Sequence, residues 1–404
     1  MLKIPFGTIT ITQTAKDLIH EALESRRISC GRLVREFEDK FAGLLGVQEA
    51  VALSSGTDAD ILALAVLHDL GAQRGDEVIV PALSFVATGN AVVHAGFTPV
   101  FVDIERETLN IDPSRIEAAI TPKTRAIMPV HLMGKPAEMD TINAIARKHG
   151  LLVVEDAAEA HGALYKGRPA GNLADLAAFS TYVAHIITTG EGGIVTTNRE
   201  DLGDILRSLR SHGRACTCKR CILNSGADYC AKRFRGAGGE DIRFTFERIG
   251  YSSKMNELEA AIGIGAMEIY HEILQKRHDN LMHVLTRFNR FAPYISTIRQ
   301  EPHERIGPHA IPMIINEAAA FTRAELTLFL EKNGVETRTL FASMPTQCPG
   351  FAYLGHRLGE FQNAEYLGQY GLHVGVHQDV GIPEMEYLLD LLAEFIEKHH
   401  PPGA

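Results

Sequence analysis

The sequence predicts an α/β protein with a mostly parallel central sheet, helices on both faces of that sheet, and a smaller C-terminal α+β domain. Short apolar runs alternate with amphipathic helical stretches over the first two-thirds of the 404 residues, which is typical of a parallel sheet covered on both sides. The alternation ends near Lys254, where a long helical segment begins. We therefore expect a large domain over residues 1–255 and a small domain over residues 256–404.

Six apolar runs in the large domain are predicted to be buried strands. They are Ala50–Leu53, Glu77–Ala82, Thr98–Ile104, Arg125–His131, Leu151–Ala157 and Ile194–Thr197. Helical periodicity between these runs predicts helices over Asp58–Leu70 and Pro136–His149. Ligand sites in such sheets collect at the carboxyl ends of the strands.

The small domain is predicted from a change of pattern. A long helical segment is expected from roughly Asn256 to Phe291, followed by strands near His309–Ile315 and Glu336–Leu340. A last helix is expected to begin at Pro383, a favoured first-turn residue, and to run to about His399.

Composition and charge narrow the function classes. Hydrophobic residues make up 45% and charged residues 22% of the chain, the balance of a folded globular protein. A net charge of -10 argues against a general nucleic-acid binder. No apolar run approaches the roughly 20 residues that span a bilayer, and the N-terminus lacks a signal-peptide core. We therefore expect a cytoplasmic protein that binds neither membrane nor nucleic acid.

Two motifs suggest a ligand site but have ordinary explanations as well. Ser54–Asp58 opens a predicted helix, where free backbone N–H groups and the helix dipole attract an anion. Such residues also serve as simple helix caps. Glu155 and Asp156 end a predicted strand, where a carboxylate can hold a cationic ring nitrogen or cap the next helix. His185 lies in an apolar neighbourhood, where a lone histidine is usually a satisfied core residue.

Four of the six cysteines fall within a loop over residues 214–235. Cys216, Cys218, Cys221 and Cys230 have the spacing C-x-C-x2-C-x8-C. Four thiolates suit tetrahedral zinc or an iron–sulfur cluster, and unligated thiols are the third interpretation. The loop is also locally basic, which indicates either a solvated surface or a docking patch. The basic residues are Arg207, Arg210, Arg214, Lys219, Arg220, Lys232, Arg233 and Arg235.

Eight stretches of the chain form an ordered set. They are SSGTDAD (54–60), VPALSFVATGNAV (80–92), FTPVFVDI (97–104), PVHLMGKPAEMD (129–140), VVEDAAEAHGA (153–163), FSTYVAH (179–185), TGEGGIVTTN (189–198) and GYSSKMNELEAAIG (250–263). Together they resemble the DegT/DnrJ/EryC1/StrS family of sugar aminotransferases, which act on nucleotide-linked ketosugars. The resemblance covers nearly the whole chain and implies the fold-type I architecture of pyridoxal phosphate (PLP) enzymes. It also implies a homodimer, because the family builds each active site from two chains.

The resemblance assigns cofactor roles to matching residues. Gly56, Thr57 and Ser180 are expected to bind the cofactor phosphate. Phe85 is expected to stack on the pyridine ring. Asp156 is expected to pair with the protonated ring nitrogen, which keeps the ring an electron sink.

Three positions depart from the family pattern. Glu159 stands where the family usually has glutamine near the ring oxygen, and Ser252 stands where it usually has an asparagine that reaches the partner's cofactor phosphate. The Schiff-base lysine of the family is replaced by His185. No lysine occurs between Lys166 and Lys219, so a small shift of the alignment cannot restore one. A histidine cannot form a Schiff base, but it can transfer protons near neutral pH.

A small branch of the family carries the same histidine, and AHIITTGEGG (184–193) resembles its sequence. This branch comprises ketosugar 3-dehydrases that use pyridoxamine phosphate (PMP). By that resemblance, PMP condenses with the 4-keto sugar, the histidine removes a proton from the PMP methylene carbon, and the C3 hydroxyl leaves. One type then takes electrons through an iron–sulfur cluster on the same chain. Another type has no cluster and finishes by releasing ammonia hydrolytically.

The cysteines favour the electron-dependent type. Cys216, Cys218 and Cys230 resemble its cluster-binding segment, but Ala158 occupies the position of its remaining cysteine. Cys221 is expected to supply the fourth thiolate instead. We expect a 2Fe–2S cluster first, a 4Fe–4S cluster second, and zinc as the alternative. The basic residues of the loop would then dock an acidic ferredoxin or another electron-donating reductase.

The leading hypothesis is a PMP- and iron–sulfur-dependent dehydrase that removes a hydroxyl from a nucleotide-linked 4-keto sugar, with His185 as the base. The second hypothesis is a redox-independent ketosugar dehydratase with a structural zinc. The third, from another class, is a catalytically inactive PLP-binding regulator or scaffold that lost its lysine.

Overall fold

A seven-stranded sheet forms the centre of the computed structural model, which describes residues 3–221, 229–235 and 238–401. The strand order is β1-β10-β9-β6-β5-β2-β4. Strand β10 is antiparallel to both neighbours, and every pair from β9 to β4 is parallel. The strands are β1 (Glu49–Leu53), β2 (Glu77–Pro81), β4 (Thr98–Val102), β5 (Thr124–Ile127), β6 (Leu152–Asp156), β9 (Leu176–Ser180) and β10 (Gly193–Thr197). The predicted mostly parallel sheet is therefore confirmed.

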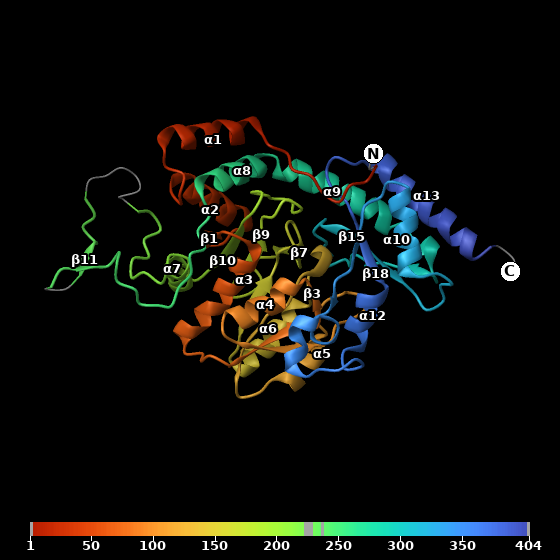
Figure 1. Cartoon of the computed structure of the whole chain (residues 1–404), viewed down its shortest axis with the longest axis horizontal. Coiled ribbons are helices and arrows are strands. Elements are labelled where there is room, and N and C mark those ends of the chain that lie inside the picture. Colours follow the sequence, from red (N-terminus) through yellow and green to blue (C-terminus); the bar gives the residue numbers. More distant parts are fainter. Residues whose placement is uncertain (1–2, 222–228, 236–237, 402–404) are drawn as a thin grey trace.

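The sheet separates two hydrophobic cores. Val78 and Val80 of β2 belong to one core, and Ile79 between them belongs to the other, because side chains alternate along a strand. Helices α3, α4 and α7 contribute to the first core and α2, α6 and α8 to the second. Their bounds are α2 (Arg32–Leu45), α3 (Gly56–Ala65), α4 (Val86–His94), α6 (Met139–His149), α7 (Glu200–Leu209) and α8 (Glu257–Glu268). Helices thus cover both faces of the sheet, as predicted (Figure 1).

The C-terminal third contains an antiparallel sheet in the order β13-β15-β18-β16. Its strands are β13 (Ile295–Ser296), β15 (Ala310–Ile315), β16 (Thr337–Thr339) and β18 (Gly371–Gly375), accompanied by α10 (Arg323–Lys332), α12 (Gln362–Tyr370) and α13 (Ile382–His399). The two predicted strands correspond to β15 and β16. The last helix begins one residue before Pro383, at Ile382.

The long helical segment predicted over roughly Asn256 to Phe291 is present, but it is divided into two helices and a 3-10 turn. The side chain of Asn256 caps α8, but Ile269 has a non-helical backbone (φ -102°, ψ 6°) that ends it. A second helix, α9 (Tyr270–Leu285), follows, and then a 3-10 turn over Phe288–Phe291. Similarly, the predicted helix to Leu70 ends as α3 at Ala65 and continues as a 3-10 turn.

Smaller elements connect the two sheets. They are α1 (Gln13–Ser25), α5 (Pro113–Ile116), α11 (Met344–Gln347), and the short strands β3 (Leu83–Ser84), β7 (Leu164–Tyr165), β8 (Arg168–Pro169), β14 (Glu304–Arg305) and β17 (Ala342–Ser343). Strand β3 pairs with β17, and β7 pairs with β14, so two strand pairings help to join the first half of the chain to the last third. The domain boundary at residue 255 stays a prediction.

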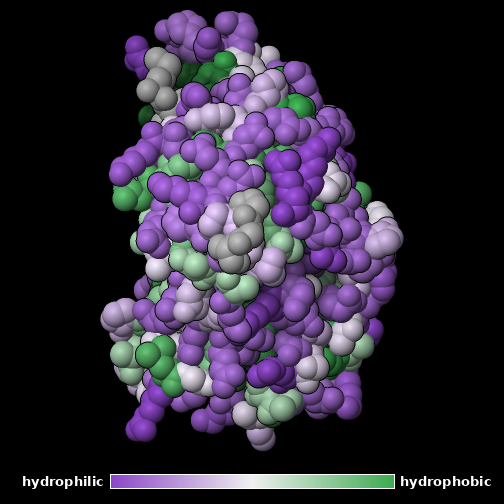
Figure 2. All heavy atoms as spheres, turned by 90° about the vertical axis from the view of Figure 1, so that its right-hand side faces the viewer, coloured by the Kyte–Doolittle hydropathy of each residue, from purple (hydrophilic) through white to green (hydrophobic). Residues whose placement is uncertain are grey.

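Residues 214–249, here called the arm, follow α7. Its described residues, 214–221, 229–235 and 238–249, carry a short hairpin of β11 (Phe234–Arg235) and β12 (Glu240–Asp241) and extend away from the body of the molecule. Several apolar side chains of the arm face solvent, and Ile249 is 83% exposed. The opposite end of the molecule, in contrast, presents a mostly hydrophilic face with small scattered hydrophobic patches (Figure 2). No helix in the described ranges is long and apolar enough to cross a membrane.

Candidate active site at the strand ends

The sheet topology brings the sequence motifs to one edge. Strands β1, β6 and β9 run in the same direction, so their carboxyl ends meet there. Ser54, Asp156 and Ser180 stand at these three ends. Strand β10 runs the opposite way, which places its first residue, Gly193, at the same edge. A Cβ atom on Gly193 would lie 2.2 Å from the carbonyl oxygen of Ser55, so the two segments touch through their backbones.

The N-terminus of α3 has the features of an anion site. The hydroxyl of Ser55 caps the helix by accepting the N–H of Asp58 at 3.0 Å, and Ser54 hydrogen-bonds the carboxylate of Asp58. A Cβ atom on Gly56 would lie 2.6 Å from the Cβ of Ser180. The glycine therefore lets the first turn of α3 approach Ser180. This arrangement leaves a small cradle of backbone N–H groups and hydroxyls suited to a phosphate.

Asp156 is buried at the carboxyl end of β6, near a second buried carboxyl group, that of Asp60. Its carboxylate accepts the hydroxyl of Thr88 at 2.7 Å and the N–H of Ala158 at 3.2 Å. Burial raises the pKa of Asp156. Burial and the charge of Asp156 raise the pKa of Asp60 well above its usual value, and Oδ1 of Asp60 has no hydrogen-bond partner among the described residues. Two buried carboxyl groups at this place fit a cofactor with a protonated ring nitrogen.

Glu155 has a different task from its neighbour. Its carboxylate accepts the N–H groups of Gly171 and Leu173, both at 2.8 Å, and lies 2.9 Å from Nε2 of His131. These contacts occupy Glu155 within the fold. Of the two strand-end carboxylates, only Asp156 is left for a ligand.

His185 follows β9 in a turn where its N–H donates to the carbonyl of Tyr182 at 3.0 Å. Its ring is surrounded by other rings, with centroids 5.3 Å from His309, 6.1 Å from His161 and 6.5 Å from Tyr182. Nδ1 of His185 is buried, and no described residue hydrogen-bonds it. Burial, with the charges of His161 and Arg277, lowers the pKa of His185 to about 3. The ring is therefore neutral at pH 7 and can accept a proton.

Arg277 connects this turn to the C-terminal third. It lies in α9, is fully buried, and donates to the carbonyl of Ala184 at 3.4 Å and to the side chain of Gln378 at 2.9 Å. Burial lowers its pKa to about 10, so it keeps its charge. His161 is likewise buried, with Nε2 2.9 Å from the carbonyl oxygen of Ser180 and a pKa lowered to about 4 by burial.

Glu159 and the aromatic residues complete the pocket. The Glu159 carboxylate accepts the N–H of Met133 at 2.7 Å and lies 3.4 Å from Nε2 of His309. Burial raises the pKa of Glu159 to about 8, so the carboxyl group is mostly protonated at neutral pH. Phe85 is 56% exposed, with its ring 5.6 Å from that of Phe341. Its open face is available to a planar ligand.

Thr57 and Ser252, both predicted to bind the cofactor phosphate, lie in different parts of the site. Thr57 stands in the first turn of α3, beside Gly56. Ser252 is exposed and forms a β-bridge with Ser211, and the carbonyl of the next residue, Ser253, accepts the N–H of Ser54 at 3.2 Å. Ser252 thus lies beside the motif of its own chain and is open to a neighbour.

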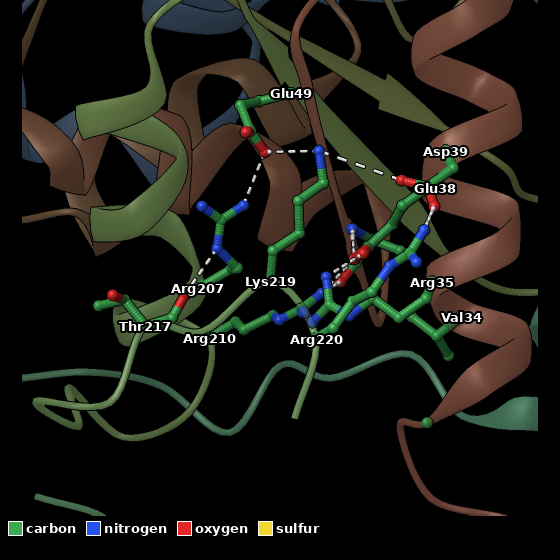
Figure 3. A network of polar contacts seen from close by, with 12 residues as sticks. Val34, Arg35, Glu38, Asp39, Glu49, Arg207, Arg210, Thr217, Lys219 and Arg220 are labelled. Atoms are coloured by element: carbon green, nitrogen blue, oxygen red, sulfur yellow. Dashed lines mark hydrogen bonds and ion pairs between the residues drawn. The ribbon is translucent and has the colours of Figure 1, made fainter. Parts of the chain in front are cut away.

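The first limb of the cysteine loop is anchored by ion pairs (Figure 3). Arg207 donates to the carbonyl of Thr217 at 2.9 Å and to Glu49 at 2.7 Å. Lys219 lies 3.5 Å from Glu49, and Arg220 lies 3.0 Å from Asp39. Helices α2 and α7 and strand β1 therefore hold residues 217–220 against the body.

Much of the basic patch predicted from the sequence is neutralised by these contacts. Arg207 and Arg210 are 5% and 2% exposed, and Arg210 pairs with the buried Glu38 at 2.6 Å. Arg233 pairs with Asp241, and Arg235 pairs with Glu247. Arg207 thus joins the arm to the body, Arg210 pairs within the body, and Arg233 and Arg235 pair within the arm.

The four thiols of the loop are not arranged as a set of metal ligands. Cys216, Cys218 and Cys221 line a groove of about 870 Å³, together with Cys30. Burial, the charge of Cys216 and a hydrogen bond with it raise the pKa of Cys218. Within residues 3–221, 229–235 and 238–401, however, no three His, Cys, Asp or Glu side chains are arranged to hold a metal ion. Cys230 stands on the other limb of the loop, and the four residues as arranged do not fit a cluster.

Sequence reasoning missed four residues of the pocket: Asp60, His161, Arg277 and His309. Asp60 and His161 lie inside the motifs SSGTDAD and VVEDAAEAHGA, so position within a motif offered a signal. Arg277 and His309 come from the C-terminal third, and no spacing in the sequence connects them with His185.

Comparison with known proteins agrees with this geometry. The sequence model of the DegT/DnrJ/EryC1/StrS aminotransferase family matches residues 10–392. The chain is 35% identical to dTDP-4-dehydro-2,6-dideoxy-D-glucose 3-dehydratase of Saccharopolyspora spinosa, covering 98% of this chain and 86% of the relative. It is also 35% identical to GDP-perosamine synthase of Caulobacter vibrioides, covering 94% and 95%.

A solved structure is similar over the full length. GDP-4-keto-6-deoxy-D-mannose-3-dehydratase of E. coli, with bound hydrated PLP, superposes with a TM-score of 0.85 at 28% identity, covering 97% of this chain and 100% of the other. The fold, the ordered motifs and the near-complete match lead to one conclusion: the chain belongs to the DegT/DnrJ/EryC1/StrS aminotransferase family.

Proposed function

We propose that the chain is a PLP/PMP-dependent 3-dehydratase that acts on a nucleotide-linked 4-keto sugar. The observation that carries this proposal is His185, a neutral base in the position where the family has its Schiff-base lysine. Relatives named as sugar 3-dehydratases, from S. spinosa and E. coli, support the same substrate class. A transaminase would need the amine that His185 lacks.

The residues around the pocket suit the cofactor by their chemistry. The first turn of α3, with Gly56 and Thr57, and the hydroxyl of Ser180 would hold the phosphate. Asp156 would pair with the ring nitrogen, and Phe85 would stack on the ring face. When bound, the cofactor supplies an electron sink for the carbon that loses a proton.

His185 would hold and return that proton. Its ring is neutral at pH 7 because burial and the nearby Arg277 disfavour a charge. For the same reason an imidazolium formed at His185 is a strong acid, able to give its proton to the departing C3 hydroxyl. Thr88 keeps the Asp156 carboxylate in place by its hydrogen bond. One residue can thus act first as base and then as acid.

The source of electrons is a separate proposal. The cysteine spacing and the Cys216–Cys218 contact support an iron–sulfur cluster, with a ferredoxin or reductase as partner. Against it stands the arrangement of the thiols, which forms no metal shell in the described part of the chain. The alternative is a dehydratase that finishes by releasing ammonia, with or without a structural zinc. The proton transfers proposed for His185 are the same in both cases.

The oligomeric state, the domain division and the cellular location are also part of the proposal. We propose a homodimer, supported by the exposed Ser252 and the apolar side chains of the arm, including Phe244 and Ile249. The division into residues 1–255 and 256–404 and a cytoplasmic location complete the proposal.

The function is tested by incubating the anaerobically purified protein with PMP and nucleotide-linked 4-keto sugars, with and without a chemical reductant. A dehydratase yields a product that has lost the C3 oxygen, seen by mass spectrometry, and the variant His185→Asn yields none. Ammonia release without reductant selects the redox-independent reaction. Iron and acid-labile sulfide in the protein, with a requirement for reductant, select the electron-dependent one.

An inactive regulator or scaffold remains the alternative from another class. It is selected if the wild-type protein binds PMP but leaves every ketosugar unchanged under both conditions. An amino sugar formed with glutamate as amino donor would contradict the dehydratase proposal directly.

A further inference from the structure

Two segments distant in sequence touch through their backbones beside the pocket. A Cβ atom on Gly134 would lie 1.9 Å from the carbonyl oxygen of Gly307, and Gly134 has a φ of +77°, so both contact and conformation require glycine. The N–H of Gly307 donates to the carbonyl of Gly134 at 2.8 Å. The N–H of His309 donates to the carbonyl of Gly307, also at 2.8 Å. The backbone leading to His309 is thereby fixed against residues 132–135.

The same turn also holds Glu159. Met133 has a φ of +54°, a left-handed conformation that costs a non-glycine residue free energy. In this conformation its N–H donates to Oε2 of Glu159 at 2.7 Å. Strain of this kind persists only where surrounding contacts impose it, and it concentrates at functional sites.

Glu159 and His309 consequently face each other next to His185. Nε2 of His309 lies 3.4 Å from Oε1 of Glu159. The His309 ring lies 5.3 Å from the His185 ring, with 32° between their planes. His309 is 7% exposed, so contact with solvent does not replace these partners.

We propose that His309 is a positioning residue for the reaction: placed beside Glu159 and fixed by the Gly134–Gly307 contact, its ring orients the ring of His185. This inference rests on the proposed function, because it describes how the base of that reaction is supported. It adds a residue from the C-terminal third and gives Glu159 a role besides that of a neighbour of the cofactor ring.

The charges around the cluster support this assignment. Burial lowers the pKa of His309 well below its usual value, and the charge of His185 lowers it further, so His309 stays neutral beside His185. The pKa of Glu159, about 8, leaves its carboxyl proton in place at neutral pH, aided by the charge of Asp156. The other titratable or charged groups that act on His309 are His161, Arg277 and His373.

A neutral Glu159–His309 pair follows from these directions. The protonated carboxyl group and the neutral ring lie 3.4 Å apart and carry no net charge. His185 therefore faces an uncharged ring. Above about pH 8 the pair gains a negative charge, which favours a proton held on His185 and opposes its return to the leaving hydroxyl.

The test compares three single variants of the full chain: His309→Asn, Glu159→Gln and His373→Asn. His373 is the matched control, because it is also a buried histidine acting on His309 but its ring contacts are with Phe6 and Phe341. The first readout is the ¹⁵N resonances of His185 in cofactor-free protein, assigned with His185→Asn. The second is the pH profile of kcat for dehydration of the ketosugar.

We expect the wild-type His185 ring to show one neutral tautomer and a small change in its resonances at about pH 8, as Glu159 ionises. His309→Asn should mix the tautomers and lower kcat about 10- to 100-fold, with little change in KM, because a misplaced base costs rate rather than binding. Glu159→Gln should keep one tautomer and remove the change at about pH 8. His373→Asn should leave the His185 resonances as in the wild type.

Equal resonances and kcat in His309→Asn and His373→Asn would overturn the inference. A change at about pH 8 that persists in Glu159→Gln would also overturn it, because another group would then be its source. A wild-type protein that turns over no ketosugar would contradict the proposed function. If the same protein shows the expected resonances, the positioning of His185 by His309 still holds. The two failures are therefore distinguishable.

Discussion

The cofactor pocket and the cysteine arm differ in how the chain holds their chemical groups. In the pocket, the ends of parallel strands bring together residues from positions 54 to 309, and two of the polar atoms, Oδ1 of Asp60 and Nδ1 of His185, lack hydrogen-bond partners in the described structure. In the arm, the reactive groups come from one short segment, and Lys219, Arg220, Arg233 and Arg235 are already paired with carboxylates. The unpartnered buried atoms in the described residues of the arm are the guanidinium nitrogens of Arg214 and Arg243, whereas those of the pocket are a carboxyl oxygen and an imidazole nitrogen.

Close spacing in sequence is therefore a weaker guide to a site than topology. The four cysteines lie within 15 residues, from Cys216 to Cys230, yet they form no metal shell. Ser54, Asp156 and Ser180 lie far apart in sequence, yet the sheet places them at one edge. Changes to the pocket and to the anchor of the arm test this contrast.

Replacing the base should have the largest effect. His185→Asn removes proton transfer but keeps a polar side chain of similar size, so turnover of the ketosugar should fall by about 10²- to 10⁴-fold. PMP affinity should change little, because the proposed cofactor contacts are made by other residues. Single-turnover mass spectrometry and a PMP titration measure the two quantities. Retention of full turnover would remove His185 from the reaction.

Removing the ion pair that anchors the arm should lower the free energy of unfolding and leave the pocket unchanged. Arg207→Ala leaves Glu49 buried without its main partner, so the free energy of unfolding should fall by about 3–5 kcal/mol. Arg220→Ala, which removes a side chain that is 80% exposed, should cost less than about 1 kcal/mol. Urea denaturation compares the two. Equal losses would show that burial of the Arg207–Glu49 pair is unimportant.

Filling the phosphate cradle should weaken cofactor binding. Gly56→Ala places a methyl group 2.6 Å from the Cβ of Ser180, and relief of such overpacking costs about 1–3 kcal/mol. We expect PMP affinity to fall by about tenfold or more. The matched control is Gly43→Ala in α2, where a Cβ meets nothing within 4 Å. Unchanged affinity in Gly56→Ala would place the phosphate elsewhere.

The pH dependence of stability should report the buried histidine. The pKa of His185 falls from 6.5 to about 3 on folding, so below pH 6.5 the unfolded chain binds a proton that the folded chain does not. Its contribution to stability is present above that pH and is lost as the pH falls. Between pH 6.5 and 5.5, the free energy of unfolding of His185→Asn should fall by about 1 kcal/mol less than that of the wild type. Urea midpoints at the two pH values measure it, and parallel curves would contradict the burial of the ring.

Most of the fold and part of the candidate site could be predicted from the sequence. Apolar runs and helical periodicity indicate β2, β4, β5 and β6, because burial on both faces leaves a clear hydrophobic signature. The break at Ile269 between α8 and α9 left no such signature. Residues at strand ends, such as Asp156, were found because a parallel sheet fixes where its carboxyl ends meet.

The rest of the site depends on contacts between distant segments. His309 lies beside His185 where Gly134 and Gly307 touch. Nothing in the sequence indicates that these two glycines are in contact. In the arm, the cysteine spacing suggested a shell, but Arg207, Lys219 and Asp39 decide where the first limb lies. Such ion pairs join residues more than 150 positions apart, beyond the reach of local pattern.

The buried guanidinium of Arg277 has a consequence for biosynthesis. It joins the turn of His185, through the carbonyl of Ala184, to Gln378 near the end of the chain. A nascent polypeptide stopped before Gln378 already contains every residue expected to contact the cofactor, yet its histidine turn lacks this tether. Assembly of a competent site therefore waits until Gln378 has left the ribosome and docked against Arg277.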